Sequence, residues 1–576
     1  MDLPESHPLI RAKRRAGRIK RHLKRKWWER NIGKQYRAWL LESQQQPPGS
    51  IDNQIAIAVI VPVYNPPVRF LQECLTSVTN QTAHHWQLIV SDDGSTDPAI
   101  RTYLDDFTNS HANDPRVIVI REGNAGISAA QNRALEQVTT EYFGWLDHDD
   151  QLNPRAIELM SETIAGAATP PQVVYSDEDK IDTKGEHFEL YCKPDFSPEL
   201  LLTQMYLCHF TVFRTDLVRQ HHGFRSDMDG AQDFDLALRL LPELTDVIHI
   251  PLPLYHWRAW SESTALTIEA KPWAQQAGAR ALQAYLDRHG GGMVEPSKVP
   301  GLNKVHPAIE GSPTVSVIIP TVGTRNPRTS ERFIDASITT LRAAEQSATL
   351  EIIAVTTGQI EAIEGADNQE VYQPSGGFNF AEAINLGRTR ATGEYLLILN
   401  DDTTADSPNP VSRLLELGQR DLVGAVGAKL TYPDGRLQHA GIVLLPSGPT
   451  HVHIAEPGNY PGYFGSTLTP RNYSAVTAAA MLTATKAFDE LGGFDTTFAR
   501  DFNDVDYCLR LRAAGYRVAW TPYAHLTHHE GASIVRKAAD PAELAEFRTR
   551  WAGEYATDPY YSPALNPSLE RIYEAL

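Results

Sequence analysis

One order of sequence features occurs twice along the chain. A β-branched apolar stretch ending in proline occurs at Ile55–Val63 and again at Val315–Pro320. Further along each half, an apolar stretch ends in acidic residues, at Asp147–Asp150 in the first half and at Asn400–Asp402 in the second. Five such landmarks keep their order at offsets between 253 and 272 residues. The repeat predicts two copies of one domain in tandem.

Short apolar stretches alternate with helical ones in each half, which predicts an α/β fold. Ile55–Val63 is typical of a buried parallel strand, and a helix at about 68–80 precedes a second strand at Trp86–Ser91. Each copy is therefore expected to contain a mainly parallel, Rossmann-like sheet. Ligands of such sheets bind beyond the carboxyl ends of the strands, where the polar clusters of this sequence stand.

The repeat divides the chain into four parts. We expect a basic arm and linker at residues 1–50, the first copy at 51–268, a helical linker at 269–313, and the second copy with a C-terminal extension at 314–576. A composition of 42% apolar and 22% charged residues excludes a mainly disordered chain. The four cysteines form no CxxC pair and no zinc spacing, so free thiols are expected.

Charge is distributed unevenly. Residues 1–46 contain 13 Lys and Arg against four Asp and Glu, a net charge of +9, while the whole chain carries −18. The acidic remainder argues against a nucleic-acid-binding protein. Residues 9–41 have the spacing of an amphipathic helix, with Lys and Arg beside Trp27, Trp28 and Trp39. This pattern predicts either a solvated basic helix or a helix lying on an anionic membrane surface.

The acidic cluster after the apolar strand Tyr142–Leu146 suggests a metal site. Carboxylates such as those of Asp147 and Asp149 repel one another, and a hard divalent cation such as Mg²⁺ or Mn²⁺ would relieve this repulsion. Such a cation could hold a diphosphate and stabilise it as a leaving group. The alternative is a solvated, Asp-rich turn.

Other candidate residues have equally plain structural alternatives. The carboxylates of Asp92 and Asp93 could accept the imide N–H of a uracil or thymine base, or could belong to an ordinary turn. Asp233 and Asp504 stand near predicted helix starts, where an acid can either act as a general base or stabilise the helix dipole.

A candidate histidine occurs late in each copy. His256 and His528 could complete a metal site or contact a leaving phosphate, and Arg258 could pair with phosphate oxygens. The alternatives are a hydrogen-bonded core histidine and a surface arginine. No GxGxxG, GxxxxGK[ST] or GxSxG motif is present, which removes support for dinucleotide oxidoreductases and P-loop enzymes and for a nucleophile elbow.

The ordered motifs PVYN, DDGSTD, NAG, DHDD and QDFDLALR resemble those of family 2 glycosyltransferases, which are inverting enzymes with the GT-A fold. The segments YSDEDKID, LYHWR, GAVGAKL, LQHAGIV and FNDVDYCLR are similar to tandem glycosyltransferases of bacterial surface polysaccharide and O-antigen assembly. The resemblance covers nearly all of residues 55–565 but not the N-terminal arm.

This resemblance implies a nucleotide-diphosphate sugar donor, a divalent cation (Mg²⁺ or Mn²⁺) and one direct displacement at the anomeric carbon. It implies that Asp233 and Asp504 are the catalytic bases. The residues expected to contact the nucleotide sugar are Pro62, Tyr64, Asn65, Asp92, Asp93, Asn124, Gly126, Arg133, Arg258, Thr321, Thr357, Gly377 and Asn385. Those expected to hold the metal are Asp147, Asp149, His256, Asn400, Asp402 and His528.

The second copy departs from the family pattern at the nucleotide-contacting acids, where Thr356 and Thr357 stand. A hydroxyl cannot supply the charge of a carboxylate, so donor binding there is expected to be weak, altered or absent. Two functions stay open: two transferase sites on one chain, or an active first domain beside a degenerate second domain that binds glycan or serves as a scaffold. A sugar nucleotidyltransferase is a third reading, without the Gly-rich basic phosphate loop that it would need near residue 62.

The acceptor implied by the resemblance is a growing glycan on a lipid carrier. Lipid-linked acceptors lie at the membrane, where residues 1–46 would bind an anionic surface. No apolar run of the sequence approaches the ~18 residues needed to span a bilayer, and the basic start is not followed by the apolar segment of a secretory signal. We therefore expect a cytoplasmic protein that is peripheral on the inner face of the cytoplasmic membrane.

Overall fold

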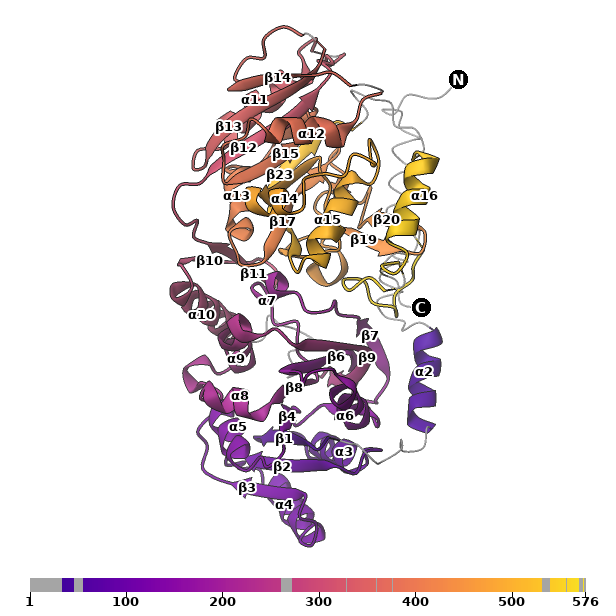
Figure 1. Ribbon diagram of the computed structural model, residues 1–576. Coiled ribbons are helices and arrows are strands. Elements are labelled where there is room, and N and C mark those ends of the chain that lie inside the picture. The colour runs from indigo at the N-terminus through magenta and orange to yellow at the C-terminus, as the bar shows by residue number, and fades with distance from the viewer. Residues whose placement is uncertain are drawn as a thin grey trace, which may run out of the picture.

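The structure, a computed structural model, describes residues 34–45, 55–260 and 272–573, apart from residues 328, 359, 375–376, 531–538, 556 and 569–572. Figure 1 shows one sheet with its helices at one end of an elongated molecule and a second sheet with its helices at the other.

The first sheet has nine strands in the order β3-β2-β1-β4-β8-β6-β9-β5, with β7 paired to β6. It is parallel across β3-β2-β1-β4 and mixed beyond, because β8 runs antiparallel to both of its neighbours. The strands are β1 (Ile57–Val63), β2 (Trp86–Asp92), β3 (Val117–Arg121), β4 (Tyr142–Trp145), β5 (Gln151–Leu152), β6 (Val173–Ile181), β7 (His187–Tyr191), β8 (Thr211–Arg214) and β9 (Val247–Arg258).

Helices cover this sheet and bury apolar side chains at helical spacing, as in α3, where Phe70, Leu71, Cys74, Leu75 and Val78 are buried. Every residue of β1 is also buried, as its unbroken apolar sequence predicts. The helices of this part are α3 (Val68–Thr79), α4 (Pro98–Ser110), α5 (Ile127–Glu136), α6 (Ala156–Gly166), α7 (Pro198–Leu201), α8 (Thr215–Gln220) and α9 (Gln232–Leu240).

The second sheet repeats the topology of the first. Its ten strands follow the order β14-β13-β12-β15-β22-β17-β23-β16, with β18 paired to β17 and β21 to β23. The strands are β12 (Thr314–Thr321), β13 (Thr349–Thr357), β14 (Asn368–Tyr372), β15 (Tyr395–Leu399), β16 (Thr403–Ala405), β17 (Val423–Thr431), β18 (Leu437–His439), β21 (Arg471–Asn472), β22 (Ala480–Ala484) and β23 (Arg517–His528). Each strand in the order given for the first sheet has a counterpart at the same position in the second sheet, and the two run in the same direction. The α/β fold expected from the sequence is therefore confirmed.

Further elements surround this second sheet. A separate hairpin, β19 (Ile442–Leu445) with β20 (Gly448–His451), lies between β18 and β21 in the sequence. The helices are α11 (Phe333–Ala344), α12 (Phe380–Arg388), α13 (Pro410–Gly418), α14 (Thr485–Glu490), α15 (Asn503–Ala513) and α16 (Pro541–Arg550).

The segment between the two sheets is more structured than a linker. Helix α10 (Pro272–Arg288) buries Ala281 and Leu282 in one apolar cluster with Phe234 and Leu238 of α9. An antiparallel pair follows, β10 (Gly292–Pro296) with β11 (Asn303–Pro307). The helix expected in this region is present, but it is packed into the core of the first part.

Ion pairs and hydrogen bonds join the two parts directly. Glu199 of α7 is buried and pairs with Arg517 (2.9 Å) and Arg420 (3.5 Å) of the second part. The hydroxyl of Ser197 donates to the amide oxygen of Asn472 (2.7 Å). These buried polar contacts join α7 to the second sheet.

Helix α2 (Lys34–Gln45) is the described piece of the predicted basic helix; residues 9–33 of that prediction lie outside the described residues. Its apolar face is covered, because Tyr36 and Leu40 are buried with Leu190 and Cys192 in one cluster. The Tyr36 hydroxyl donates to Asp179 Oδ2 at 2.5 Å. This part of the amphipathic face thus packs on protein. Among the described helices, none combines the length and the apolar character that a membrane span requires.

Candidate functional sites at the ends of the two sheets

Asp93 organises the part of the first site that is predicted to bind the nucleotide. It follows β2, and its carboxylate accepts hydrogen bonds from the backbone N–H groups of Ala125 (3.0 Å) and Gly126 (2.9 Å). Arg133 of α5 pairs with the same carboxylate at 2.6 Å. Gly126 has a φ of 97°, and a Cβ there would lie 2.3 Å from Asp229 Oδ2, so the turn requires glycine. The carboxylate therefore ties the NAG loop to the end of β2.

The loop after β1 lies against the loop after β2. Asn65 has a φ of 46°, and its side-chain oxygen accepts the N–H groups of Thr96 (2.8 Å) and Asp97 (3.1 Å). Asp92 accepts the N–H of Ser95 at 3.0 Å and is buried. Tyr64 is 47% exposed. Of the other predicted residues, Asn124 is exposed and Pro62 is buried in β1, where its carbonyl lies 3.1 Å from the ring of His148.

The acidic cluster contains residues in two different environments. Asp150 is buried and accepts the Tyr255 hydroxyl (2.5 Å) and the Arg258 N–H (2.6 Å). Burial, followed by the charges of Asp149 and Asp147, raises its pKa well above the usual value. Asp147 and Asp149 are only partly buried. Asp150 is thus a structural group, and the oxygens of the other two suit a hard divalent cation.

Asp233 lies in the first turn of α9 and is partly buried. Its carboxylate accepts the N–H of Phe234 at 2.8 Å. Burial raises its pKa, which the positive charge of His209 partly opposes and the charge of Asp147 reinforces. The predicted base and the predicted metal carboxylate are therefore close enough for their charges to interact.

Two predicted residues of the first site occupy structural positions. Arg258 is fully buried, pairs with Glu73 of α3 (2.7 Å) and donates to the carbonyl of Asp149 (2.7 Å). Its guanidinium is thus used within the fold, which disfavours the predicted phosphate contact. His256 donates its Nδ1–H to the carboxylate of Asp179 on the neighbouring strand (2.6 Å).

Strand alternation explains why His256 lies apart from the acidic cluster. Tyr255 faces that cluster through its bond to Asp150, so its neighbour in β9 points to the opposite face. The register of β9 against β5 in the first copy can be compared with that of β23 against β16 in the second. This comparison makes Thr527 the counterpart of His256, and His528 the counterpart of Trp257. The predicted correspondence between His256 and His528 is wrong by one residue, which changes the face of the sheet. His256, His187 and Asp179 form a separate group whose ligand atoms lie within 4.8 Å of one another.

The second site brings its three predicted metal ligands together. His528 Nε2 lies 3.0 Å from Asp402 Oδ1 and 3.2 Å from the side-chain nitrogen of Asn400. His528 Nδ1 lies 2.8 Å from Gln438 Oε1, whose amide nitrogen in turn donates to Glu530 (2.9 Å).

This hydrogen-bond chain fits a cation. Glu530 accepts only, so the amide of Gln438 must present its oxygen to the imidazole, and Nδ1 of His528 must carry a proton. Two states of the ring are then possible. In the first the ring is an imidazolium, and Nε2–H donates to the carboxylate of Asp402. In the second the ring is neutral, and the lone pair of Nε2 faces the carboxylate of Asp402, which is also an acceptor. A divalent cation between them satisfies the second case, and such second-shell hydrogen bonding is typical of metal-binding histidines.

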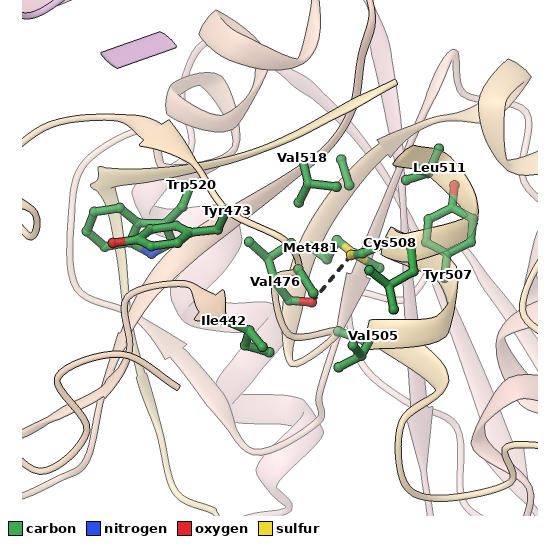
Figure 2. Close-up of a cluster of buried hydrophobic side chains, with 14 of the residues drawn as sticks. Ile442, Tyr473, Val476, Met481, Val505, Tyr507, Cys508, Leu511, Val518 and Trp520 are labelled. Atoms are coloured by element: carbon green, nitrogen blue, oxygen red, sulfur yellow. Dashed lines mark hydrogen bonds between the residues drawn. The ribbon is translucent and has the colours of Figure 1, made fainter. Parts of the chain in front are cut away.

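Asp504 lies in the first turn of α15 and is the counterpart of Asp233. Its carboxylate accepts the N–H groups of Val505 (2.8 Å) and Ala478 (3.1 Å). The helix is held by the apolar cluster of Figure 2, in which the Cys508 thiol donates to the carbonyl of Val476. The core below α15 thus positions the predicted base beside the end of β22.

The predicted nucleotide-contacting positions differ between the copies. Thr356 is fully buried and donates to backbone carbonyls, and Leu386 stands where the first copy has Arg133. Both members of the Asp93–Arg133 ion pair are therefore missing from the second copy. Thr357, at the position of Asp93, has a buried hydroxyl without a hydrogen-bond partner among the described residues.

The remaining predicted residues of the second copy have other surroundings. Asn385 bonds the backbone of Phe494 in both directions (2.8 and 3.0 Å), a structural role. Thr321 donates to Asp401 (2.6 Å), and Gly377 is exposed. Gln438 was not predicted, although it lies within the LQHAGIV segment.

Comparisons with known proteins agree with the motifs. Residues 58–221 match the family Glycosyl transferase family 2. The chain is 38% identical over 544 residues to "Uncharacterized protein y4gI" of Sinorhizobium fredii, covering 90% of this chain and 58% of that protein. It is 32% identical over 546 residues to "O-antigen biosynthesis protein RfbC" of Myxococcus xanthus, covering 90% and 41%. The chain thus spans about half the length of these two relatives.

Shorter and more distant likenesses also occur. Over 185 residues the chain is 31% identical to "Chondroitin synthase" of Pasteurella multocida, which covers 32% of this chain and 18% of that protein. A solved structure, S. aureus TarS 1-349, has 19% identity and a TM-score of 0.30, covering 41% of this chain and 72% of that one.

Proposed function

We propose that this chain, whose residues 58–221 form a glycosyl transferase family 2 domain, is a nucleotide-sugar-dependent glycosyltransferase of surface polysaccharide assembly. One observation carries the proposal: Asp93, Asp147 and Asp233 come from three separate segments of the family pattern and lie around one end of the first sheet. A nucleotide base, a metal-bound diphosphate and an acceptor hydroxyl need acids in that arrangement.

The first site suits one inverting displacement. Asp93 and Asp92 are buried and hold the loops that would surround the nucleotide, and Tyr64 offers an exposed ring beside them. Asp147 and Asp149 would hold Mg²⁺ or Mn²⁺, which supplies positive charge for a departing diphosphate. Asp233 takes the proton from the acceptor hydroxyl as that oxygen attacks the anomeric carbon, and its raised pKa brings it closer to the working pH of a general base.

The second copy supports two candidate functions. The closely arranged Asp402 and His528, with Asp504 at a helix start, favour a second transferase site with its own cation. The missing acid–arginine pair favours a degenerate module that binds glycan or serves as a scaffold. We propose the first, with a donor whose base is recognised without a carboxylate.

The acceptor we propose is a growing, lipid-linked glycan at the inner face of the cytoplasmic membrane. The name of the relative in O-antigen biosynthesis and the net charge of +9 over residues 1–46 support this location. Because α2 packs on protein, the membrane-binding part of the arm would lie before Lys34. Deletion of residues 1–33 should release the protein from anionic vesicles; unchanged co-sedimentation would refute the anchor.

The activity is tested with purified full-length protein, Mn²⁺ and a panel of UDP-, GDP- and dTDP-sugars. Release of the nucleoside diphosphate, increased by added glycan acceptor, is the expected result. Release of pyrophosphate from a nucleoside triphosphate and a sugar 1-phosphate would instead support a nucleotidyltransferase.

Base substitutions distinguish one active site from two. Asp233→Asn and Asp504→Asn should each remove one linkage from the product, as read by mass spectrometry. Asp501→Asn, at a nearby residue outside the proposed site, is the matched control for the second copy. If Asp504→Asn leaves every product unchanged, the second copy is a binding or scaffold module.

A further inference from the structure

His209 is a partly buried histidine of the first part that the acidic motifs do not include. It lies two residues before β8, and its backbone N–H and ring Nδ1 both approach Glu178 Oε2, at 2.5 and 3.1 Å. Lys193 lies 3.5 Å from the same oxygen and donates to the His209 carbonyl at 3.1 Å. The histidine is therefore held by charge and by hydrogen bonds on one side.

The aromatic contacts of His209 fix its ring beside the acidic cluster. The ring stacks on Tyr255 with 4.6 Å between centroids and 22° between planes, and Trp257 lies 5.6 Å away. The Tyr255 hydroxyl is bonded to Asp150 and accepts the N–H of Asp147. The imidazole thus lies against the aromatic ring that supports the predicted metal motif.

One edge of the ring is available for a ligand. When Glu178 is ionised it can accept hydrogen bonds but cannot donate one. The proton of its contact with His209 therefore belongs to Nδ1 of the imidazole. Within the described part of the chain no hydrogen bond is formed at Nε2. Burial and the charge of Lys193 oppose protonation of the ring, but Glu178 together with Asp147 raises the pKa of His209, which favours a positive charge with an N–H donor at Nε2.

The second copy uses a different strand for its histidine. Ladder registers match Thr211 of β8 to Met481 of β22, so that His209 corresponds to Ala479. The carbonyl of Ala479 accepts the N–H of Asn400 at 3.0 Å, which places this position directly beside the metal motif. In turn, the position of His528 holds Trp257 in the first copy. A histidine from outside the motif thus lies beside it in each copy, His528 on β23 in the second and His209 before β8 in the first.

We propose that His209 is a substrate-binding residue of the first site, and that its Nε2–H donates to the diphosphate of the bound nucleotide. This inference rests on the proposed transferase function. The chemistry is that of a cation and hydrogen-bond donor beside a metal-bound oxyanion, where a charge-assisted contact is strong. Glu178 and Lys193 are then positioning residues, because they act through the imidazole.

Calorimetry measures the binding of UDP, GDP and dTDP in the presence of Mn²⁺. Saturation-transfer NMR measures the binding of the matching nucleosides, which lack the diphosphate. The protein is the full chain carrying Asp402→Asn, so that binding reports on the first site. His209→Ala should weaken the diphosphate that binds best by about 10- to 100-fold and leave its nucleoside unchanged. Glu178→Gln should show a smaller loss in the same direction.

A rescue separates a ligand contact from a structural role. Adding Trp257→His to His209→Ala supplies an imidazole from the strand that the second copy uses, and should recover part of the lost diphosphate affinity. Thermal unfolding shows whether each variant is folded, and His209→Gln is the second variant if His209→Ala is not.

Different outcomes overturn different claims. If His209→Ala and His209→Gln bind both ligands as tightly as the parent, or weaken nucleoside and diphosphate equally, His209 does not contact the diphosphate. If no nucleoside diphosphate binds the unmodified chain and no donor is turned over, the proposed function itself fails.

Discussion

The Asp93–Arg133 pair gives a quantitative test of how the first nucleotide site is built. Asp93 is 3% exposed and accepts two backbone N–H bonds besides its 2.6 Å contact with Arg133. Asp93→Thr, which copies the second domain, removes a buried charge partner and leaves at least one backbone donor unsatisfied. We expect a loss of about 3 kcal/mol, since breaking a buried pair typically costs about 3–5 kcal/mol and Arg133 remains partly accessible to water.

Substitution of the other member of the pair should lower the free energy of unfolding by less. Arg133→Leu leaves the carboxylate with its two backbone bonds, for an expected loss of about 1–2 kcal/mol. In the double variant the arginine is no longer left without its partner, so the two losses should fall short of additivity by about 1–2 kcal/mol.

The assay is thermal unfolding of the four proteins of this cycle, following the transition of the first domain. At roughly 2–4 °C per kcal/mol for a domain of this size, Asp93→Thr should lower Tm by about 6–12 °C. Losses that add fully in the double variant, or an unchanged Tm for Asp93→Thr, would refute the argument that this carboxylate is the centre of the NAG loop.

Three further predictions concern pH, metal and the N-terminal helix. Because burial raises the pKa of Asp233, the base is protonated and inactive at pH values where an ordinary aspartate is still ionised; the acidic limb of kcat/KM should therefore lie above pH ~4, and a limb at the ordinary value would contradict this. His528→Ala should weaken Mn²⁺ binding at the second site about 10- to 100-fold in an EPR titration, whereas His84→Ala, at an exposed histidine outside every predicted site, should not; equal losses would contradict the assignment of His528 as a ligand. Tyr36→Phe should make α2 more sensitive to limited proteolysis than Leu41→Ala does, because only Tyr36 is buried with a bond to the body; equal rates of cleavage would contradict the docking of α2.

Much of the fold could be predicted because it depends on local patterns. Buried parallel strands such as β1 and β12 are unbroken apolar runs, and their repeat gives the duplicated topology. The resemblance to family 2 is confirmed by the family match over residues 58–221. The acids at the strand ends could be located because the carboxyl ends of parallel strands meet at one edge of a sheet.

The errors arose where a side chain depends on distant partners. His256 and His528 follow similar motifs, but a shift of one residue in a strand reverses the face on which a side chain lies. Arg258 is buried because Glu73, on a helix far away in sequence, neutralises it. An amphipathic pattern such as that around Tyr36 fits a membrane and a protein surface equally well.

His209 had no sequence signal of its own. Its place beside the acidic cluster depends on Glu178, on Lys193 and on the packing of Tyr255, which come from separate segments. Only the correspondence of the two sheets shows that His209 and His528 lie beside their motifs from different segments of the fold.

The most direct test of the central claim compares full-length protein with its Asp233→Asn variant, with Mn²⁺ and the sugar nucleotide that the panel identifies. The measurement is nucleoside diphosphate release in the presence of acceptor. We expect Asp233→Asn to lower kcat by about 10²- to 10⁴-fold for the linkage made by the first site, with little change in donor KM. An unchanged kcat for every linkage would contradict the assignment of Asp233 as the base of a transferase site.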